Sequence, residues 1–108
     1  MMEDVCMSGK PFVVACIPAF NEERSIARVV LGVRRYVDRV IVCDDGSTDM
    51  TGEIAEALGA FVVRHERNMG YGAAICSLFR EAFKIGADIA VTLDGDGQHV
   101  FYTSSMHI

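Results

Sequence analysis

Residues Val40–Ser47 read VIVCDDGS: four apolar residues are followed directly by two aspartates, a glycine and a serine. Residues Ile89–Asp96 repeat this plan as IAVTLDGD. Short, continuous apolar runs are typical of strands that are buried on both faces of a parallel sheet. If both runs belong to one sheet, their acidic clusters lie at the same edge, beyond the carboxyl ends of the strands, where open α/β sheets bind ligands. Converging carboxylates there suggest a metal ion and an anionic ligand that the metal neutralises.

Strand-like and helical segments alternate along the chain on both sides of these two stretches. The predicted strands are Phe12–Ile17, Val40–Cys43, Phe61–Val63 and Ile89–Leu93, and the predicted helices are Glu22–Tyr36, Thr51–Leu58 and Ala73–Ile85. Alternation of this kind implies right-handed crossovers between parallel strands. We therefore predict an α/β fold with a mostly parallel four-stranded sheet and helices on both faces.

Single residues set the expected ends of these elements. Pro18 is expected to end the first strand, and Asn21 is expected to cap the helix that follows. Thr48 or Asp49 is available as the cap of the second helix. Gly86 is expected to stop the third helix.

The composition is that of one globular domain. The chain has 108 residues, of which 51% are hydrophobic and 23% are charged. Its formal net charge of −5 argues against a nucleic-acid-binding surface. The four cysteines form no CxxC pair, so we expect reduced thiols in a cytosolic protein, and the spacing of the three histidines argues against a zinc site.

No segment has the pattern of a secretory leader or a membrane span. Glu3 and Asp4 do not fit the positively charged start of a signal peptide. The longest apolar run, Phe12–Phe20, is too short to cross a bilayer. We therefore expect a cytoplasmic chain without a transmembrane segment, in which any attachment to the cytoplasmic face of the membrane is peripheral.

Asp94, Asp96 and Gln98 place oxygen-bearing side chains at alternating positions just after a predicted strand. Gly95 allows the backbone to turn between the two aspartates. Carboxylates in this arrangement can hold Mg²⁺ or Mn²⁺, which prefer oxygen ligands and share them with substrate phosphates. The alternative is a polar turn, because Asp-Gly pairs are common turn formers.

Asp44 and Asp45 follow the second predicted strand, where a carboxylate can accept hydrogen bonds from the ring N–H groups of uracil or guanine. The desolvation of two adjacent carboxylates is costly unless each has a partner. We therefore expect one of them to face a ligand and the other to cap the next segment or face solvent. The alternative is a turn followed by a helix cap, with no ligand.

Two further segments reach the same edge. Pro18 and Phe20 can form an apolar wall for a nucleobase, with Glu22 as a polar contact. Gly70-x-Gly72 opens the third helix and suits phosphates, but the third glycine of a dinucleotide-binding motif is absent and there is no P-loop sequence. Arg67 can contact base or phosphate, and its alternative role is that of a solvated surface arginine.

The joint order of these motifs is far more specific than any one of them. Strand-Pro-x-x-Asn-Glu, strand-Asp-Asp-Gly-Ser, Asn-x-Gly-x-Gly and strand-Asp-x-Asp-x-Gln follow one another over residues 12–99. This order resembles the family 2 glycosyltransferases and, more narrowly, the dolichyl-phosphate mannose synthase group of polyprenyl-phosphate sugar transferases. The resemblance implies the nucleotide-sugar-binding half of a Rossmann-like GT-A fold. It also implies metal-assisted transfer of a sugar from a UDP- or GDP-sugar to a polyprenyl phosphate or a growing glycan, with Mg²⁺ or Mn²⁺ as cofactor.

The resemblance assigns roles to residues of this chain. The implied nucleotide-binding residues are Pro18, Phe20, Glu22, Asp44, Asp45, Arg67, Asp94 and Gly95. The implied metal ligands are Asp94, Asp96 and Gln98, and Asp96 is also the implied catalytic residue. Asp44 is the first choice for contact with the base, and Asp45 is the second.

The C-terminal end departs from the family pattern. We expect residues 1–10 to be a lead-in, residues 11–99 an incomplete donor-binding domain that stops after the Asp-x-Asp strand, and residues 100–108 an atypical tail able to form one short extended segment. Members of the family usually continue with an acceptor-binding half. We therefore expect this chain to bind nucleotide weakly and to transfer sugar poorly or not at all alone, and an uncovered sheet edge to favour self-association.

Two other functional classes stay open at this point. One is a non-catalytic nucleotide- or metal-binding module, or an inert truncated fragment. The other is a receiver-like signalling domain with a phospho-accepting aspartate at a strand end. The position of the acidic pair argues against this class, because the pair follows the second predicted strand and not the first.

Overall fold

The computed structural model describes residues 10–95 and 100–104, with side chains for residues 10–95. Within these ranges the strands are β1 (Val13–Ala19), β2 (Arg39–Asp44), β3 (Phe61–Arg64), β4 (Ile89–Leu93) and β5 (Val100–Ser104). The helices in the same ranges are α1 (Ile26–Val33), α2 (Thr51–Ala57) and α3 (Tyr71–Lys84). A strand or helix therefore lies in each of the four predicted strand segments and three predicted helix segments, but the first helix is shorter than predicted.

The strands form one sheet in the order β3-β2-β1-β4-β5. β1 pairs in parallel with both β2 and β4, so that Cys16 lies opposite Ile41 on one side and Thr92 on the other. β5, which comes from the segment assigned above to the tail, pairs antiparallel with β4 and places Val100 opposite Leu93. The parallel strands bring the carboxyl ends of β1, β2 and β4 to one edge of the sheet.

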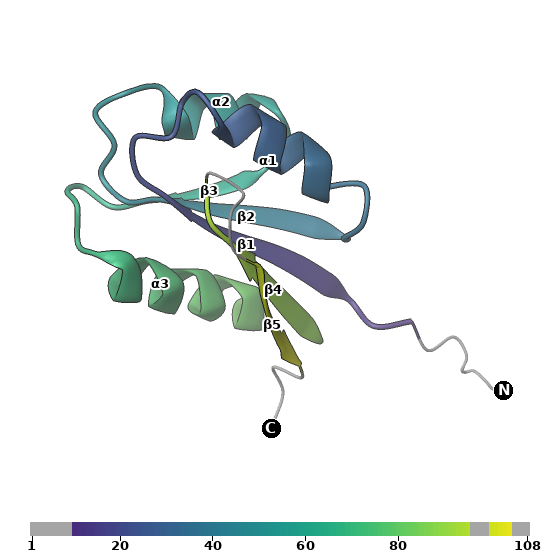
Figure 1. Cartoon of the computed structure of the whole chain (residues 1–108). Coiled ribbons are helices and arrows are strands. Elements are labelled where there is room, and N and C mark those ends of the chain that lie inside the picture. Colours follow the sequence, from purple (N-terminus) through teal and green to yellow (C-terminus); the bar gives the residue numbers. More distant parts are fainter. Residues whose placement is uncertain (1–9, 96–99, 105–108) are drawn as a thin grey trace, which may run out of the picture.

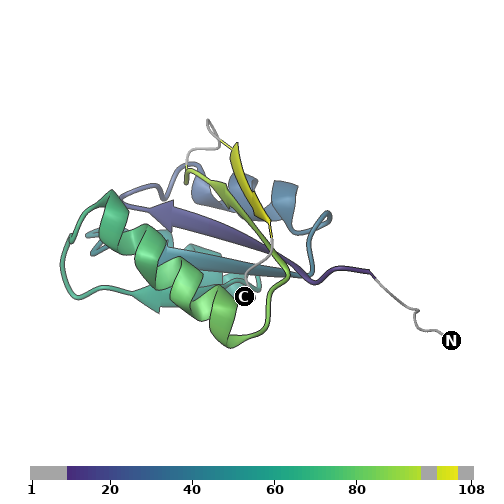
Figure 2. The ribbon, with the colours of Figure 1, turned by 90° about the horizontal axis from the view of Figure 1, so that it is seen from below.

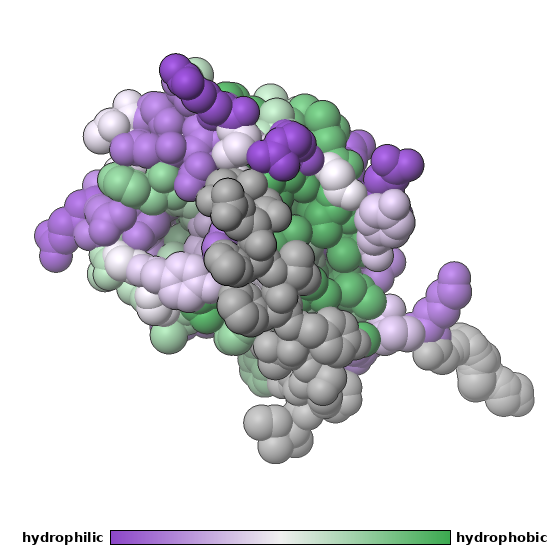
Figure 3. All heavy atoms as spheres, in the orientation of Figure 1, coloured by the Kyte–Doolittle hydropathy of each residue, from purple (hydrophilic) through white to green (hydrophobic). Residues whose placement is uncertain are grey.

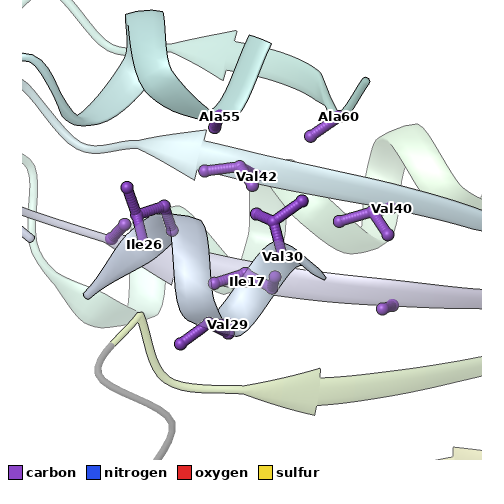
Figure 4. Packing of buried hydrophobic residues seen from close by; sticks show 10 residues of the cluster. Ile17, Ile26, Val29, Val30, Val40, Val42, Ala55 and Ala60 are labelled. Carbon is purple, nitrogen blue, oxygen red and sulfur yellow. The ribbon is translucent and has the colours of Figure 1, made fainter. Parts of the chain in front are cut away.

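Helices cover both faces of this sheet. Figure 1 shows α1 and α2 on one face and α3 on the other, and Figure 2 shows α3 lying across the strands. Alternate β1 side chains serve the two faces: Ile17 packs in the layer beneath α1 and α2, whereas Val14 packs in the layer beneath α3. In Figure 4, Ile17 and Val42 of the sheet lie against Ile26 and Val30 of α1. These two apolar layers fix the sheet on which the polar edge is built.

Cysteines contribute to the layer beneath α3 as small hydrophobic residues. Cys16 and Cys43 are buried free thiols, and Cys76 is an exposed one. Burial raises the pKa of Cys16 and of Cys43 to about 12, and the nearby carboxylates of Asp45 and Asp44 add to the effect at Cys43. No disulfide links the cysteines in residues 10–95, and Cys6 lies outside the described residues.

The prediction that Pro18 ends the first strand is wrong. β1 continues through Pro18 to Ala19, with Pro18 opposite Cys43 of β2. On the other side, β4 pairs with β1 only as far as Cys16. The missing N–H of proline therefore leaves no gap in the ladder with β4, because that ladder has already ended.

The prediction that Asn21 caps a long helix beginning at Glu22 is also wrong. α1 runs only from Ile26 to Val33, and its N-cap position is Ser25. Asn21 has a left-handed φ of 52°, and its side-chain oxygen accepts a hydrogen bond from the backbone of Thr48 instead. Gly86, by contrast, follows α3 with a φ of 86°, as predicted for a helix stop. None of the helices in the described part of the chain is long and apolar enough to cross a membrane.

Candidate functional site

A cleft of about 380 Å³ opens at the carboxyl edge of the sheet, between the ends of β1, β2 and β4 and the start of α3. Its lining residues are Pro18, Ala19, Phe20, Glu22, Asp45, Asn68, Gly70, Tyr71, Ala74, Asp94 and Gly95. Six of the ten residues that the sequence analysis assigned to a nucleotide or metal site thus meet in one place, together with Gly70. They are Pro18, Phe20, Glu22, Asp45, Asp94 and Gly95.

Two other predicted site residues, Asp44 and Arg67, are not among the described lining residues of this cleft. Asp44 lies beneath α2, and Arg67 is exposed beside a separate surface depression. Asp96 and Gln98 lie outside the described residues. Of the three predicted metal ligands, Asp94 alone therefore lies within the described residues.

The cleft is acidic. Glu22, Asp45 and Asp94 bring three carboxylates to it, and there is no lysine or arginine among its described lining residues. In Figure 3 the hydrophilic surface gathers on the side that carries the loops after β2 and β3, whereas hydrophobic residues gather beside α1. A lining of this charge favours a cation, or an anion that arrives with one.

Asp94 offers the least engaged of these carboxylates. It directly follows β4, and within residues 10–95 and 100–104 its side chain makes no hydrogen bond or ion pair. Among the residues with described side chains, the one hydrogen bond that the Glu22 carboxylate accepts comes from the Ser25 hydroxyl, at 3.1 Å. These two side chains offer the hard oxygen donors that Mg²⁺ and Mn²⁺ prefer, and no cationic side chain is among the described lining residues, so the residues present fit such an ion.

Gly95 lets the segment after β4 approach the loop after β1. A Cβ atom at this position would lie 3.0 Å from the side chains of both Ala19 and Glu22. The carbonyl oxygen of Gly95 lies 3.1 Å from the Ser25 hydroxyl, which can donate to it or to Glu22. The Asp94-Gly95 turn is therefore held against the segment that carries Glu22.

Asp45 has the opposite character, because its carboxylate is already bonded. Oδ1 accepts from His65 Nδ1 at 2.7 Å and from the backbone N–H of Met69 at 2.9 Å, and Oδ2 accepts from the backbone N–H of Gly70 at 2.9 Å. Burial opposes ionisation of Asp45, but the donors from Met69, His65 and Gly70 outweigh it and lower the pKa of this carboxyl below its ordinary value. Asp45 is thus a fixed anion in the cleft wall.

Asp44 points into the protein on the other side of β2. Its Oδ1 accepts the backbone N–H of Ser47 at 3.0 Å, and its Oδ2 lies 3.5 Å from Arg64 Nη1. Gly52 of α2 makes room for this ion pair, since a Cβ there would lie 2.4 Å from the Asp44 carboxylate. Successive residues of a strand face opposite sides, and Asp45, but not Asp44, is among the described lining residues of the cleft.

The loops after β1 and β2 bind each other through reciprocal hydrogen bonds. The Asn21 side chain accepts from Thr48 N–H at 2.8 Å, and the Asn21 N–H donates to the Ser47 hydroxyl at 2.9 Å. One residue on, Glu22 N–H donates to the Thr51 hydroxyl at 2.8 Å. Hydrogen bonds between polar residues of the Pro-x-x-Asn-Glu and Asp-Asp-Gly-Ser motifs therefore hold the loops after β1 and β2 together in the absence of a ligand.

Gly46 brings a third loop into contact. Its φ is 77°, and a Cβ atom here would lie only 2.3 Å from the backbone carbon of Arg67. The Asn68 side chain also donates to the Asp45 carbonyl at 3.3 Å. The glycine of the Asp-Asp-Gly-Ser motif is therefore required by the close approach of the 65–70 loop.

Sequence reasoning missed Tyr71 and His65. Tyr71 lines the cleft at the first position of α3, directly after Gly70, and the residue is 55% exposed. His65 was set aside for lack of metal-ligand spacing, yet it directly follows β3 and bonds Asp45. Its position after a strand end was the available signal, because Asp45 and Asp94 of the cleft also directly follow strands.

Residues 14–103 match the family model described as Glycosyl transferase family 2. The chain is 38% identical over 101 residues to UDP-N-acetylglucosamine–dolichyl-phosphate N-acetylglucosaminyltransferase of Methanococcus voltae, and the match covers 77% of this chain and 40% of that protein. It is 32% identical over 91 residues to polyprenol monophosphomannose synthase of Mycolicibacterium smegmatis, with 77% and 34% covered.

A solved structure shares the fold. Glucosyl-3-phosphoglycerate synthase from Mycobacterium tuberculosis, in complex with Mn²⁺, UDP and glucosyl-3-phosphoglycerate, superposes with a TM-score of 0.66 at 33% identity, covering 79% of this chain and 33% of that one. The α/β fold predicted from the sequence is thereby confirmed. The chain spans 40% or less of the length of these three proteins.

Proposed function

The chain belongs to glycosyl transferase family 2, and from this we propose that its cleft is the donor site for a nucleotide sugar, with the GT-A arrangement of that family. One observation carries the proposal. The cleft combines a fixed anion in its wall, Asp45, with a carboxylate that has no partner in the described residues, Asp94. A nucleoside diphosphate needs both a hydrogen-bond acceptor for its base and a cation for its phosphates.

The base would contact Asp45 and pack beside Pro18, Phe20 and Tyr71. These three residues line the cleft, and the side chains of Phe20 and Tyr71 are 44% and 55% exposed. Exposed rings next to a polar anchor are typical of sites that take a flat, partly polar ligand. Uracil and guanine both carry the ring N–H that Asp45 would accept.

The diphosphate would lie at the β4 end with Mg²⁺ or Mn²⁺. Asp94 would hold the ion, and we propose Asp96 and Gln98, which lie outside the described residues, as its further ligands. When bound, such an ion neutralises the negative charge that grows on the leaving diphosphate. The M. tuberculosis synthase has been solved with UDP and either Mn²⁺ or Mg²⁺, which supports this assignment.

The proposed reaction is transfer of a sugar from a UDP- or GDP-sugar, with Asp96 as the proposed catalytic residue. The names of the Methanococcus and Mycolicibacterium relatives support a polyprenyl or dolichyl phosphate as acceptor. A phosphate oxygen is already an anion at neutral pH, so it needs little help from a general base. An acceptor carried by a lipid would bring the protein to a membrane surface as a peripheral enzyme.

Calorimetric titration of the purified chain with UDP and GDP, each with and without Mn²⁺, tests the donor site. We expect one nucleotide to bind in a Mn²⁺-dependent manner. Asp94→Asn should weaken that binding by at least about 100-fold, because removing a direct ligand costs more than the 10- to 100-fold typical of outer-shell changes. The exposed Glu66 lies outside the cleft lining, so Glu66→Gln is a control for the lost charge. No binding of either nucleotide by the folded chain would reject the proposal.

A second candidate is a nucleotide-binding module that performs no transfer, because the cleft described above is sufficient for binding. Nucleotide affinity without turnover of a nucleotide sugar and a polyprenyl phosphate would identify it.

We also propose that the chain self-associates. Figure 3 shows a hydrophobic surface beside α1, and separately Leu31 of this helix is 48% exposed; both observations support that proposal. Size-exclusion chromatography over a range of concentrations tests it.

A further inference from the structure

His65 is a nearly buried titratable residue for which the proposed donor site supplies no role. Its side chain is only 10% exposed. Nδ1 lies 2.7 Å from Asp45 Oδ1, and Nε2 lies 2.9 Å from the hydroxyl of Ser77 on α3. The ring therefore bridges the cleft wall and the helix beneath the sheet.

The chemistry of the two partners fixes the tautomer of the ring. An ionised carboxylate can only accept hydrogen bonds, so the proton must lie on Nδ1 and point at Asp45. In the neutral ring Nε2 is then an acceptor, and the Ser77 hydroxyl can donate to it. Both ring nitrogens are thus satisfied without a net charge on His65.

The order Asp45–His65–Ser77 is that of a hydrolytic triad, but its position excludes that role. Ser77 lies in the middle of α3 and is not among the residues that line the cleft. The Cys43 thiol, 3.7 Å from Nε2, is no nucleophile either, because burial raises its pKa to about 12. The contacts of His65 therefore serve the geometry of Asp45.

The Asp45 carboxylate has about four acceptor positions, and three are filled by His65, Met69 and Gly70. Oδ1 has two donors, whereas Oδ2 has only one. One acceptor position on Oδ2 is left for a ligand. Of the three donors, only that of His65 belongs to a side chain, and the same ring also contacts Ser77 of α3.

We propose that His65 is a positioning residue of the donor site, which holds Asp45 so that Oδ2 can accept a hydrogen bond from a nucleobase. This inference rests on the proposed function of the cleft. It states that nucleotide affinity depends on a side chain that does not touch the ligand. It also states that the bonds from the Met69 and Gly70 amides depend on the same side chain.

Two substitutions of His65 separate this role from mere filling of space. In His65→Asn the amide nitrogen takes the place of Nδ1, so a donor to Asp45 is kept and the contact with Ser77 is lost. In His65→Gln the amide reaches the place of Nε2, so the contact with Ser77 is kept and the donor to Asp45 is lost. Neither substituted side chain titrates.

The experiment compares amide hydrogen exchange and UDP or GDP affinity, with Mn²⁺ present, in the wild type, His65→Asn, His65→Gln and the control Glu66→Gln. We expect His65→Gln to lose about tenfold in nucleotide affinity and about tenfold in exchange protection at Met69 and Gly70, as for loss of one hydrogen bond to a charged group. His65→Asn and Glu66→Gln should stay within about threefold of the wild type, a difference that is small against the tenfold loss. The amide of residue 65 itself, bonded to the Asp44 carbonyl at 3.0 Å, is the internal reference.

Equal exchange and equal affinity in the Asn and Gln variants would overturn the inference. If the wild type binds neither nucleotide, the proposed function fails, while the exchange comparison still decides whether His65 orders Asp45. If neither variant folds, ¹⁵N NMR of the wild-type imidazole decides instead. A protonated Nδ1 supports the positioning role, and a protonated Nε2 with a bare Nδ1 overturns it.

Discussion

The two acidic strand ends look alike in sequence but differ in structure. At the β2 end, Asp44 and Asp45 are buried, and both carboxylates are bonded to groups of the protein. At the β4 end, Asp94 is half-buried and has no such bond within the described residues. The β2 end is a finished polar network, whereas the β4 end presents a carboxylate that still lacks a partner.

This difference assigns separate tasks to the two ends. A buried carboxylate is tolerated only when donors compensate its lost hydration, and Asp45 has three of them. Its network orders the loop at Met69 and Gly70, and so shapes the cleft. Within the described residues Asp94 makes no contribution of that kind, and we propose that its carboxylate takes a cation. The β2 end should therefore govern stability, and the β4 end should govern metal binding.

The largest expected effect is that of Gly46→Ala. The new Cβ would lie 2.3 Å from the Arg67 backbone at a φ of 77°, so we expect a loss of more than about 3 kcal/mol in unfolding free energy. Gly72→Ala is the matched control, since Gly72 lies in α3 with no atom within 4 Å of the added Cβ. The unfolding free energy of Gly72→Ala should rise by about 0.5–1 kcal/mol. Urea denaturation measures both, and equal stabilities would show that the loops are not in contact as described.

Asp45→Ala and Asp94→Ala test the comparison itself. The first leaves the N–H groups of Met69 and Gly70 and the His65 ring without their acceptor, at a cost of about 3 kcal/mol. The second removes no such bond among the described residues, and should change stability by less than about 0.5 kcal/mol. Thermal and urea unfolding of the metal-free proteins provide the values. A larger loss in Asp94→Ala than in Asp45→Ala would reverse the proposed division of tasks.

The pH dependence of stability should also lie at the β2 end. The folded-state pKa of Asp45 is below its ordinary value of 3.8, so its contribution is complete above about pH 4 and is lost as the pH falls through the folded-state value. The gap in unfolding free energy between wild type and Asp45→Asn should therefore narrow as the pH is lowered from about 6 to about 2. A constant gap would mean that Asp45 is not a stabilised anion.

The smallest expected effect concerns the bonds between the loops after β1 and β2. Asn21→Gly keeps the left-handed φ of 52° but removes the acceptor for Thr48 N–H, at a cost of about 1 kcal/mol. Asn21→Ala should cost more, because alanine disfavours that φ. Urea denaturation of both variants checks this order. An Ala variant as stable as the Gly variant would contradict the backbone conformation at Asn21.

The sequence was sufficient for the order and type of the elements because apolar periodicity is a local property. It failed at Pro18 and Asn21, where partners distant in sequence decide. β1 continues past Pro18 because β4 has already stopped pairing, and Asn21 is bonded to Thr48, 27 residues away. Neither contact leaves a periodic signal.

For the candidate site, as for the fold, the sequence indicated local features but not the contacts between residues that are distant in sequence. Strand ends indicated Asp94, Gly95 and the acidic pair, because the carboxyl edge of a parallel sheet collects such residues. The choice between Asp44 and Asp45 depended on which face of β2 each side chain takes, and the sequence did not reveal that. His65 was missed because its partners, Asp45 and Ser77, come from two other elements.

The central claim is that the β4 end holds the cation, and NMR of the ¹⁵N-labelled chain titrated with paramagnetic Mn²⁺ in the presence of UDP tests it most directly. We predict that amide signals of Glu22, Asp94 and Gly95 broaden first, and that Asp94→Asn abolishes this selective broadening. Amides at the opposite edge of the sheet, such as Ala60, should stay sharp. Broadening that is uniform, or that centres on the exposed acidic residues Glu53 and Glu56 of α2, would contradict the account.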